Sequence, residues 1–149
     1  MDIKVFTNDL IDDVIAFEKE LRKQEDVYGW DIDEQYIASL SNSFVDPAFD
    51  NSLSLLAYND NKVVGRIDVS FICTHFDGSK RGYLDWICVL PSYRHKGTAQ
   101  GLLYEMRIRL KQLGINSLVG IIAGNEEAQR FYKNIPNATI RDEGIWIDL

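Results

Sequence analysis

The fold is decided by one short stretch of the chain, Val89-Leu90-Pro91-Ser92-Tyr93-Arg94-His95-Lys96-Gly97-Thr98-Ala99. Residues 83–90, which lead into it, are mostly apolar and predict a buried central strand. The residues after it carry apolar side chains at helical spacing, and they predict a helix that begins near Thr98 and stops at Gly114. A strand, a tight loop and a helix therefore follow one another directly.

The loop in this stretch has the features of an anion-binding site. The first N–H groups of a helix have no partner within the helix, and the helix dipole adds positive potential there. Gly97 has no Cβ, so the backbone can approach a ligand closely. An ordinary strand-to-helix loop with basic surface residues is the alternative, but position, order and spacing together favour a pyrophosphate site. The residues predicted to hold the anion are Arg94, His95, Lys96, Gly97, Thr98, Ala99 and Gln100.

The rest of the chain predicts a sheet and helices around this unit. Before it come a strand at 3–6, helices at about 10–21 and 33–40, and a hairpin of strands 53–58 and 62–72. After it come a strand at 116–122, a helix at about 125–133, and a small hairpin of 139–141 with 145–148. The strand-helix-strand unit 83–122 implies a parallel pair. The predicted fold class is α+β (α/β three-layer), with a mixed, mostly antiparallel central sheet, one parallel pair and helices on both faces.

Length and composition predict a single domain over residues 1–149. The formal net charge of −7 argues against nucleic-acid binding and leaves room for a cationic partner. No apolar run has the length of a membrane span, and the first residues lack the form of a signal peptide. Cys73 and Cys88 lie in apolar runs, which predicts buried free thiols in a reducing compartment. We expect a cytoplasmic protein that binds neither a membrane nor a metal.

Two motifs resemble those of a known family. Arg94-x-x-Gly97-x-Ala99, preceded by Val89-x-Pro91, resembles the signature of the GNAT superfamily of N-acetyltransferases, and Asn125-x-x-Ala128-x-x-Phe131-Tyr132 resembles its second conserved stretch. The order of predicted elements is also GNAT-like. The chain departs from the family after Tyr132, where Ile135-Pro136-Asn137-Ala138 stands in place of the frequent Gly-Phe, so the start of the last hairpin is open.

The resemblance implies an acyltransferase that moves an acetyl group from acetyl-CoA to a primary amine of a small molecule or peptide by direct attack. A non-catalytic acyl-CoA-binding sensor or interaction module is the alternative, and homodimers are common in the family. In the family, strand backbone at Ile87, Cys88 and Val89 pairs with the pantetheine arm, and Asn125 contributes to cofactor binding besides capping its helix. A covalent role for Cys88 is less favoured, because no histidine stands at an activating spacing.

The chemistry requires a base and an acid. Neutralising an alkylammonium group near pH 7 costs about 4.6 kcal/mol, so a base or water chain must take its proton. Asp85 is the first candidate, because strand alternation places it on one face with Ile87; a purely structural role is as well supported, and Asp68 is a second candidate. The resemblance implies that Tyr132 protonates the departing thiolate, while Phe131 packs in the core.

The acceptor site is predicted at the loop between the first two helices. Tyr28, Trp30 and Asp31 combine aromatic faces with negative charge, which suits an ammonium ligand. A solvated acidic surface with the aromatic side chains packed on the core is the alternative. Polyamines, aminoglycosides, amino-acid derivatives and protein amines all remain open.

Overall fold

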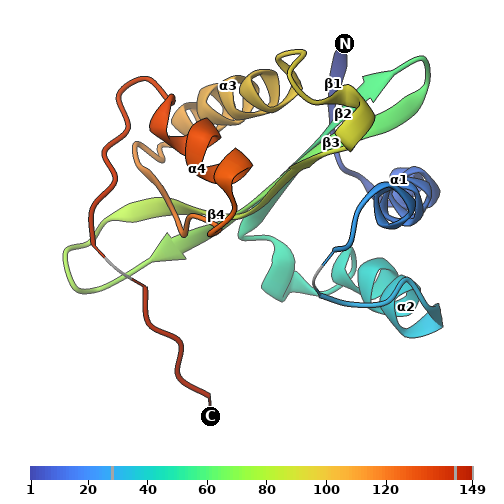
Figure 1. Ribbon diagram of the computed structural model, residues 1–149. Coiled ribbons are helices and arrows are strands. Elements are labelled where there is room, and N and C mark those ends of the chain that lie inside the picture. The colour runs from blue at the N-terminus through green and yellow to red at the C-terminus, as the bar shows by residue number, and fades with distance from the viewer. Residues whose placement is uncertain (28, 143, 149) are drawn as a thin grey trace. The chain divides into compact units, whose positions relative to one another are not determined.

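The computed structural model describes residues 1–27, 29–142 and 144–148 (Figure 1). The chain forms two compact units, Met1–Val119 and Gly120–Leu149. Among the described residues, no helix combines the length and the apolar character that crossing a membrane requires.

The first unit is built on a mixed sheet whose strands follow chain order. They are β1 (Asp2–Val5), β2 (Ser52–Asn59), β3 (Lys62–Cys73), β4 (Lys80–Val89) and β5 (Leu118–Gly120). β1 to β4 pair antiparallel. β5 runs parallel to β4, and Gly82 N donates to Ser117 O at 2.9 Å where the two meet. The predicted mixed sheet with one parallel pair is therefore confirmed.

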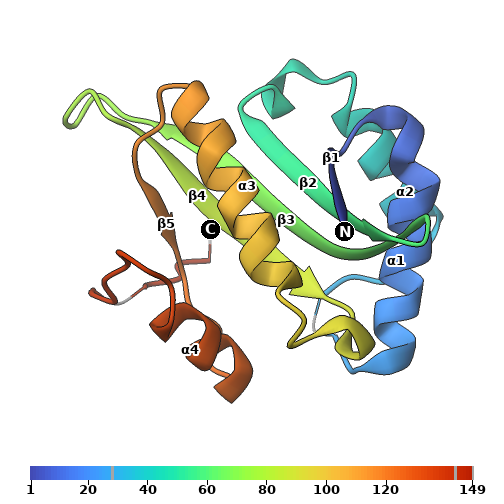
Figure 2. The same ribbon diagram turned by 90° about the horizontal axis from the view of Figure 1, so that it is seen from above.

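Helices cover both faces of this sheet (Figure 2). They are α1 (Ile11–Gln24), α2 (Glu34–Ser43) and α3 (Thr98–Gln112). Gly65 and Arg66 are neighbours on β3, so their side-chain positions lie on opposite faces. A Cβ at Gly65 would lie 3.1 Å from Leu102 of α3, whereas Arg66 Nη1 lies 3.4 Å from a carboxylate oxygen of Glu18 on α1. The prediction of helices on both faces is confirmed.

The apolar core follows the predicted spacings. On α1, Val14, Phe17 and Leu21 are at most 2% exposed, which confirms the helical face seen in the sequence. On the other face, Leu102 and Met106 of α3 are fully buried with the inward side chains of β3. The hairpin of β2 and β3 turns at residues 59–62, where Asp60 and Asn61 take positive φ angles of 49° and 62°. These elements hold the stretch 89–99 on a rigid frame.

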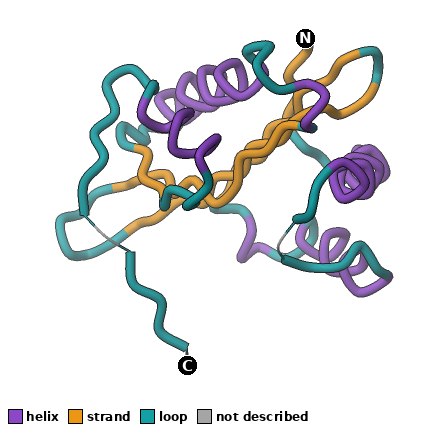
Figure 3. The backbone as a smooth tube through the Cα atoms, in the orientation of Figure 1, coloured by secondary structure: helices purple, strands orange, loops and turns teal. Residues whose placement is uncertain are grey.

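Some element boundaries differ from the sequence prediction. α2 continues three residues beyond the predicted end at Leu40, and β4 begins at Lys80 rather than near Tyr83. In the second unit α4 (Glu126–Lys133) forms as predicted, but the described residues of the expected final hairpin form no strand (Figure 3). Ile145, Trp146 and Ile147 are 81%, 73% and 72% exposed. An isolated two-stranded hairpin with no core to cover is marginal, which explains this error.

Candidate functional site

The loop before α3 has the backbone geometry of an anion site. After β4 the chain makes a 3-10 turn, η3 (Pro91–Tyr93), and then passes through two left-handed residues, His95 with φ 59° and Gly97 with φ 83°. Gly97 is the residue preceding α3, and no side chain caps the helix. The first N–H groups of a 15-residue helix are therefore available to a ligand. These features fit the diphosphate of a CoA-type cosubstrate.

The basic side chains of this loop contact the protein itself. Arg94 Nη2 lies 2.5 Å from Glu25 Oε1, and Arg94 Nε donates to Val89 O at 3.0 Å. Lys96 Nζ donates to Ser92 O at 2.9 Å. His95 and Gln100 are exposed, Ala99 is half-buried, and Thr98 is buried against the sheet. The predicted residues thus share one loop, and the Arg94 side chain in it is bound to Glu25 and to the carbonyl of Val89.

One edge of β4 is open beside this loop. Leu90 N donates to Val64 O, so pairing with β3 falls on alternate residues, and Cys88 directs its backbone groups towards Arg66. Ile87 and Val89 then direct theirs the other way. β5 has three residues and enters opposite Gly82, so it ends before it reaches that part of β4. Of the three predicted strand residues, Ile87 and Val89 therefore offer backbone groups to an extended ligand, and Cys88 does not.

A β-bulge in β4 changes the side-chain pattern near Asp85. Asp68 pairs with Trp86 but Val69 pairs with Leu84, so Asp85 is an extra residue with no partner on β3. Ser70 Oγ donates to Asp85 Oδ2 at 2.5 Å, which places this exposed carboxylate on the face of α1 and α2. The prediction that Asp85 shares a face with Ile87 is wrong, because the bulge inserts a residue between them. It brings Asp85 and Trp86 to the same face instead.

A network of paired charges lies on this face under α1. Glu18 is fully buried, and its carboxylate contacts Arg22 Nη1 at 2.7 Å and Arg66 Nη1 at 3.4 Å. Arg66 also reaches Asp68, with Nε 2.7 Å from Oδ2 and Nη2 donating to Oδ1 at 2.9 Å. Burial opposes the charge of Arg66, but the carboxylate of Asp68 raises its pKa above the usual value. Asp68 is thus engaged by Arg66 and by Ser54 Oγ, which leaves it poorly placed to act as a base.

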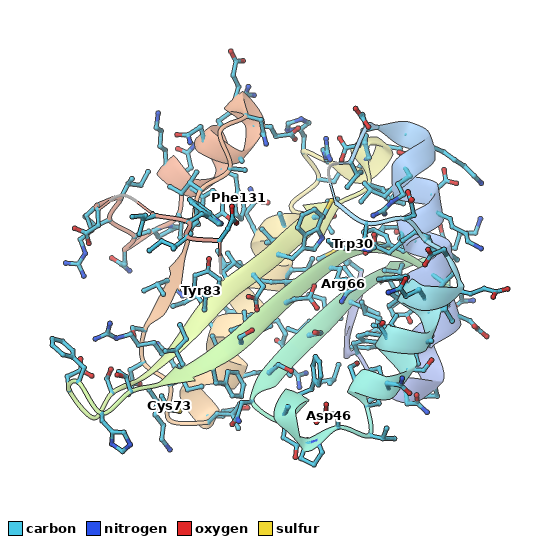
Figure 4. The ribbon with its side chains drawn as sticks, turned by 90° about the horizontal axis from the view of Figure 1, so that it is seen from below. Trp30, Asp46, Arg66, Cys73, Tyr83 and Phe131 are labelled. Atoms are coloured by element: carbon cyan, nitrogen blue, oxygen red, sulfur yellow. The ribbon has the colours of Figure 1, made fainter. Side chains whose placement is uncertain are left out.

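Three aromatic side chains gather beside this network. The ring of Trp30 stacks on Tyr36 of α2 with centroids 6.0 Å apart, and it contacts Trp86 of β4 at 5.9 Å. Arg22 holds Trp30 in place, since its guanidinium lies 5.5 Å from the ring centroid and Nη2 donates to Trp30 O at 3.0 Å. Figure 4 shows Trp30 and Arg66 on this face of the sheet. The sequence did not assign Trp86 or Tyr36 to a site. The bulge in β4 brings Trp86 to Trp30, and the position of α2 brings Tyr36 to it.

Of the other two residues predicted to bind the acceptor, Asp31 is described by the structure. Asp31 follows Trp30 and is exposed. Tyr28 lies outside the described residues.

Cys88 and Cys73 differ in their surroundings. Burial, reinforced by the nearby carboxylate of Glu25, raises the pKa of Cys88 to about 11, so its side chain is a thiol at neutral pH. Cys73 is exposed, contrary to the prediction of two buried thiols, because it is the last residue of β3 and pairs with Lys80 beside a polar turn. Cys88 therefore lacks the lowered pKa of an activated nucleophile, which agrees with direct transfer.

The second unit carries the remaining predicted residues on α4. Asn125 Oδ1 accepts from Ala128 N at 2.8 Å, so the predicted helix cap is confirmed. This leaves the Asn125 amide NH₂ group for a ligand. Tyr132 is half-buried and meets the edge of Phe131 with ring centroids 5.3 Å apart. Desolvation raises the pKa of Tyr132, which keeps the phenol protonated.

Comparison with known proteins identifies the family of the chain. Residues 15–135 match the model of the acetyltransferase (GNAT) family, which is most of the chain, and the chain therefore belongs to this family. It is accordingly an N-acetyltransferase that takes its acetyl group from acetyl-CoA. No curated protein sequence matches the chain significantly.

Solved structures show the same fold at low sequence identity. An aminoglycoside antibiotic 6′-N-acetyltransferase from Acinetobacter haemolyticus has a TM-score of 0.76 at 17% identity, over 100% of this chain and 98% of that one. A ribosomal-protein-alanine N-acetyltransferase from Brucella melitensis biovar Abortus 2308 has 0.74 at 16%, over 99% and 100%. A predicted acetyltransferase with acetyl-CoA from Clostridium acetobutylicum has 0.71 at 18%, over 99% and 94%. These relatives differ in acceptor, so the fold alone leaves the acceptor open.

Proposed function

We propose that the chain acetylates a primary amine of a small molecule or peptide by direct attack of the amine on acetyl-CoA. The observation that carries this proposal is the uncapped N-terminus of α3, which follows the left-handed Gly97 and adjoins the open edge of β4. N–H groups at residues 98–100 bind the diphosphate, and the backbone of Ile87 and Val89 pairs with the pantetheine arm. The resemblance to the family also assigns a part in cofactor binding to Asn125.

Polarisation of the thioester carbonyl falls to a backbone donor. The N–H of Ile87 is directed to the open edge of β4, where no described strand competes for it. A fixed N–H donor aimed at a developing oxyanion is worth about 3 kcal/mol in other acyl-transfer enzymes. Ile87 therefore contributes through its backbone, while its side chain lies on the α3 face.

Tyr132 is the proposed general acid. Burial favours its neutral form, so it holds a proton to give at neutral pH. The thiolate released from the thioester takes that proton and leaves as a thiol. Exposed tyrosines of the chain lack this shielding, as with Tyr104, which is 69% exposed.

Asp85 is the proposed base, acting through water. Its carboxylate is exposed and is held by Ser70 Oγ on the face where the aromatic cluster lies. Asp68 is the weaker candidate, because its Oδ1 accepts from both Arg66 and Ser54 and its Oδ2 is buried in the ion pair with Arg66. We propose that residues 1–149 work as one transferase domain. The free thiols of Cys73 and Cys88 fit a reducing compartment such as the cytoplasm.

The test measures CoA thiol release and acetyl-CoA binding in parallel. The purified chain should bind acetyl-CoA by calorimetry and release thiol only when an amine is present. Thiol release that does not depend on an amine would indicate thioester hydrolysis instead. If the chain does not bind acetyl-CoA, the proposal that the loop before α3 holds the cosubstrate is wrong.

A further inference from the structure

We infer that the acceptor carries an ammonium group next to an aromatic or other flat apolar group, and that Asp85 and Trp30 recognise these two parts. This inference rests on the proposed function, because it describes the acceptor of that reaction. It is carried by the way in which the face of α1 and α2 combines the exposed indole of Trp30 with the carboxylate of Asp85.

Trp30 is held as a rigid apolar wall. Tyr36 covers one side of the indole, Trp86 touches it, and Arg22 fixes both its ring and its carbonyl. Even so, 42% of Trp30 is exposed. An indole that is positioned on several sides and still faces solvent offers a planar surface with little conformational entropy to lose on binding.

Three carboxylates near the Trp30 indole are paired with arginines. Glu18 is paired with Arg22 and Arg66, and Asp68 is paired with Arg66. Glu25, at the start of the acceptor loop, is paired with Arg94. These residues therefore offer no net negative field to a cation, although they contribute to the acidic composition of the chain.

Asp85 is different. Among the described residues it makes no ion pair, and its only hydrogen bond comes from the neutral hydroxyl of Ser70. The bulge places it next to Trp86, which contacts Trp30. Trp86 Nε1 is buried and has no hydrogen-bond partner within the described part of the chain, so it can also donate to an oxygen of the acceptor. One carboxylate beside an aromatic surface suits one ammonium group beside an apolar body.

The experiment compares acceptors of matched charge. Rates of thiol release are measured under one set of conditions with phenethylamine and n-propylamine, each of which carries one ammonium group. We expect kcat/KM for phenethylamine to exceed that for n-propylamine by at least about tenfold, which corresponds to about 1.4 kcal/mol. Trp30→Ala should reduce the ratio of phenethylamine to n-propylamine by about tenfold, and Trp30→Phe should restore part of it.

Phe76→Ala is the matched control, since Phe76 is 90% exposed in the turn between β3 and β4. It should leave both rates unchanged, and a melting curve shows whether Trp30→Ala remains folded. Equal or faster turnover of n-propylamine than of phenethylamine would overturn the inference while the proposed function stands. An equal effect of Trp30→Ala on every amine would also overturn it. If no amine is turned over, the inference fails too, and acetyl-CoA binding then shows whether the cosubstrate site fails with it.

Discussion

Arg94 and Glu25 form an ion pair, with Nη2 2.5 Å from Oε1, that joins the loop before α3 to the residue that ends α1. The adjacent Gln24 adds a second link, because its Oε1 accepts from Ser92 N at 3.2 Å. Glu25 begins the loop that leads to Trp30. The loops proposed to bind the cosubstrate and the acceptor are therefore joined by direct contacts within the first unit.

Glu25→Gln should weaken both binding steps. Loss of the carboxylate removes the restraint on Arg94 and loosens the start of the acceptor loop, so KM for acetyl-CoA and for the amine should each rise about threefold to tenfold. Steady-state kinetics measures both constants. Glu105→Gln is the control, because it removes a pair of similar exposure, Glu105 with Arg109 at 2.8 Å, on α3. Unchanged KM values in Glu25→Gln would mean that the pair is only structural.

Gly97→Ala tests the anion site separately from backbone strain. Gly97 has φ 83°, and no described protein atom lies within 4 Å of the position that a Cβ would take. The substitution therefore costs about 1 kcal/mol of stability through its left-handed backbone, and the new methyl group projects where the diphosphate approaches. We expect acetyl-CoA affinity to fall about tenfold or more in calorimetry.

Gly78→Ala is its control. Gly78 has φ 68° in the turn between β3 and β4 and is equally free of neighbours in the described structure. It should lose similar stability without losing acetyl-CoA affinity. Equal affinity losses in the two variants would show that Gly97 acts through general stability.

Tyr132→Phe should lower kcat about 100-fold and leave acetyl-CoA affinity within twofold, because the variant removes only the proton donor. Tyr104→Phe, at an exposed position of α3, should be silent. A Tyr132→Phe enzyme with normal turnover would exclude the acid role.

Asp85→Asn and Asp68→Asn should separate catalysis from stability. Asp85 is exposed and unpaired with any described cation, so its variant should lower kcat about tenfold or more with an unchanged melting temperature. Asp68→Asn leaves Arg66 without its bidentate partner, and it should cost about 3 kcal/mol of stability. Chemical denaturation and steady-state rates measure the two effects. The opposite pattern would transfer the base role to Asp68.

Much of the fold and of the cosubstrate loop could be predicted because their signals are local. Gly97 marks the loop by its conformational freedom, and Val14, Phe17 and Leu21 mark α1 by their spacing. The bulge at Asp85 could not be predicted, because it depends on the pairing of two strands and leaves no pattern within either one. That single inserted residue reversed the predicted face of Asp85 and brought Trp86 to Trp30.

The failed hairpin at the end of the chain has a different cause. Ile145-Trp146-Ile147 has strong strand propensity, but propensity is decided by packing, and these side chains pack little in this structure. The charge network could not be predicted from the sequence either. Nothing in the sequence distinguishes Glu18 from the other acidic residues, and only the contact between α1 and β3 pairs it with Arg66.

Cys88 provides the last prediction, on pH. Its folded pKa of about 11 is raised from a reference of 9.0, chiefly by burial. A group whose pKa is raised on folding stabilises the protein fully below the unfolded value, and this stabilisation is lost as the pH rises through the folded value. The contribution of Cys88 should therefore disappear between pH 9.0 and about 11. Tyr58, whose pKa is also raised by burial and by its bond to Asp13, adds to the loss at higher pH.

The measurement combines alkylation with thermal melting. Near pH 8 the raised pKa keeps Cys88 in its thiol form, so iodoacetamide should label the exposed Cys73 first and Cys88 only on unfolding. Cys88→Ser should keep its turnover, because direct transfer needs no thiolate, and its melting temperature should fall less steeply with pH above about 9. Rapid labelling of native Cys88, together with loss of turnover on labelling, would instead favour a covalent acetyl-cysteine route.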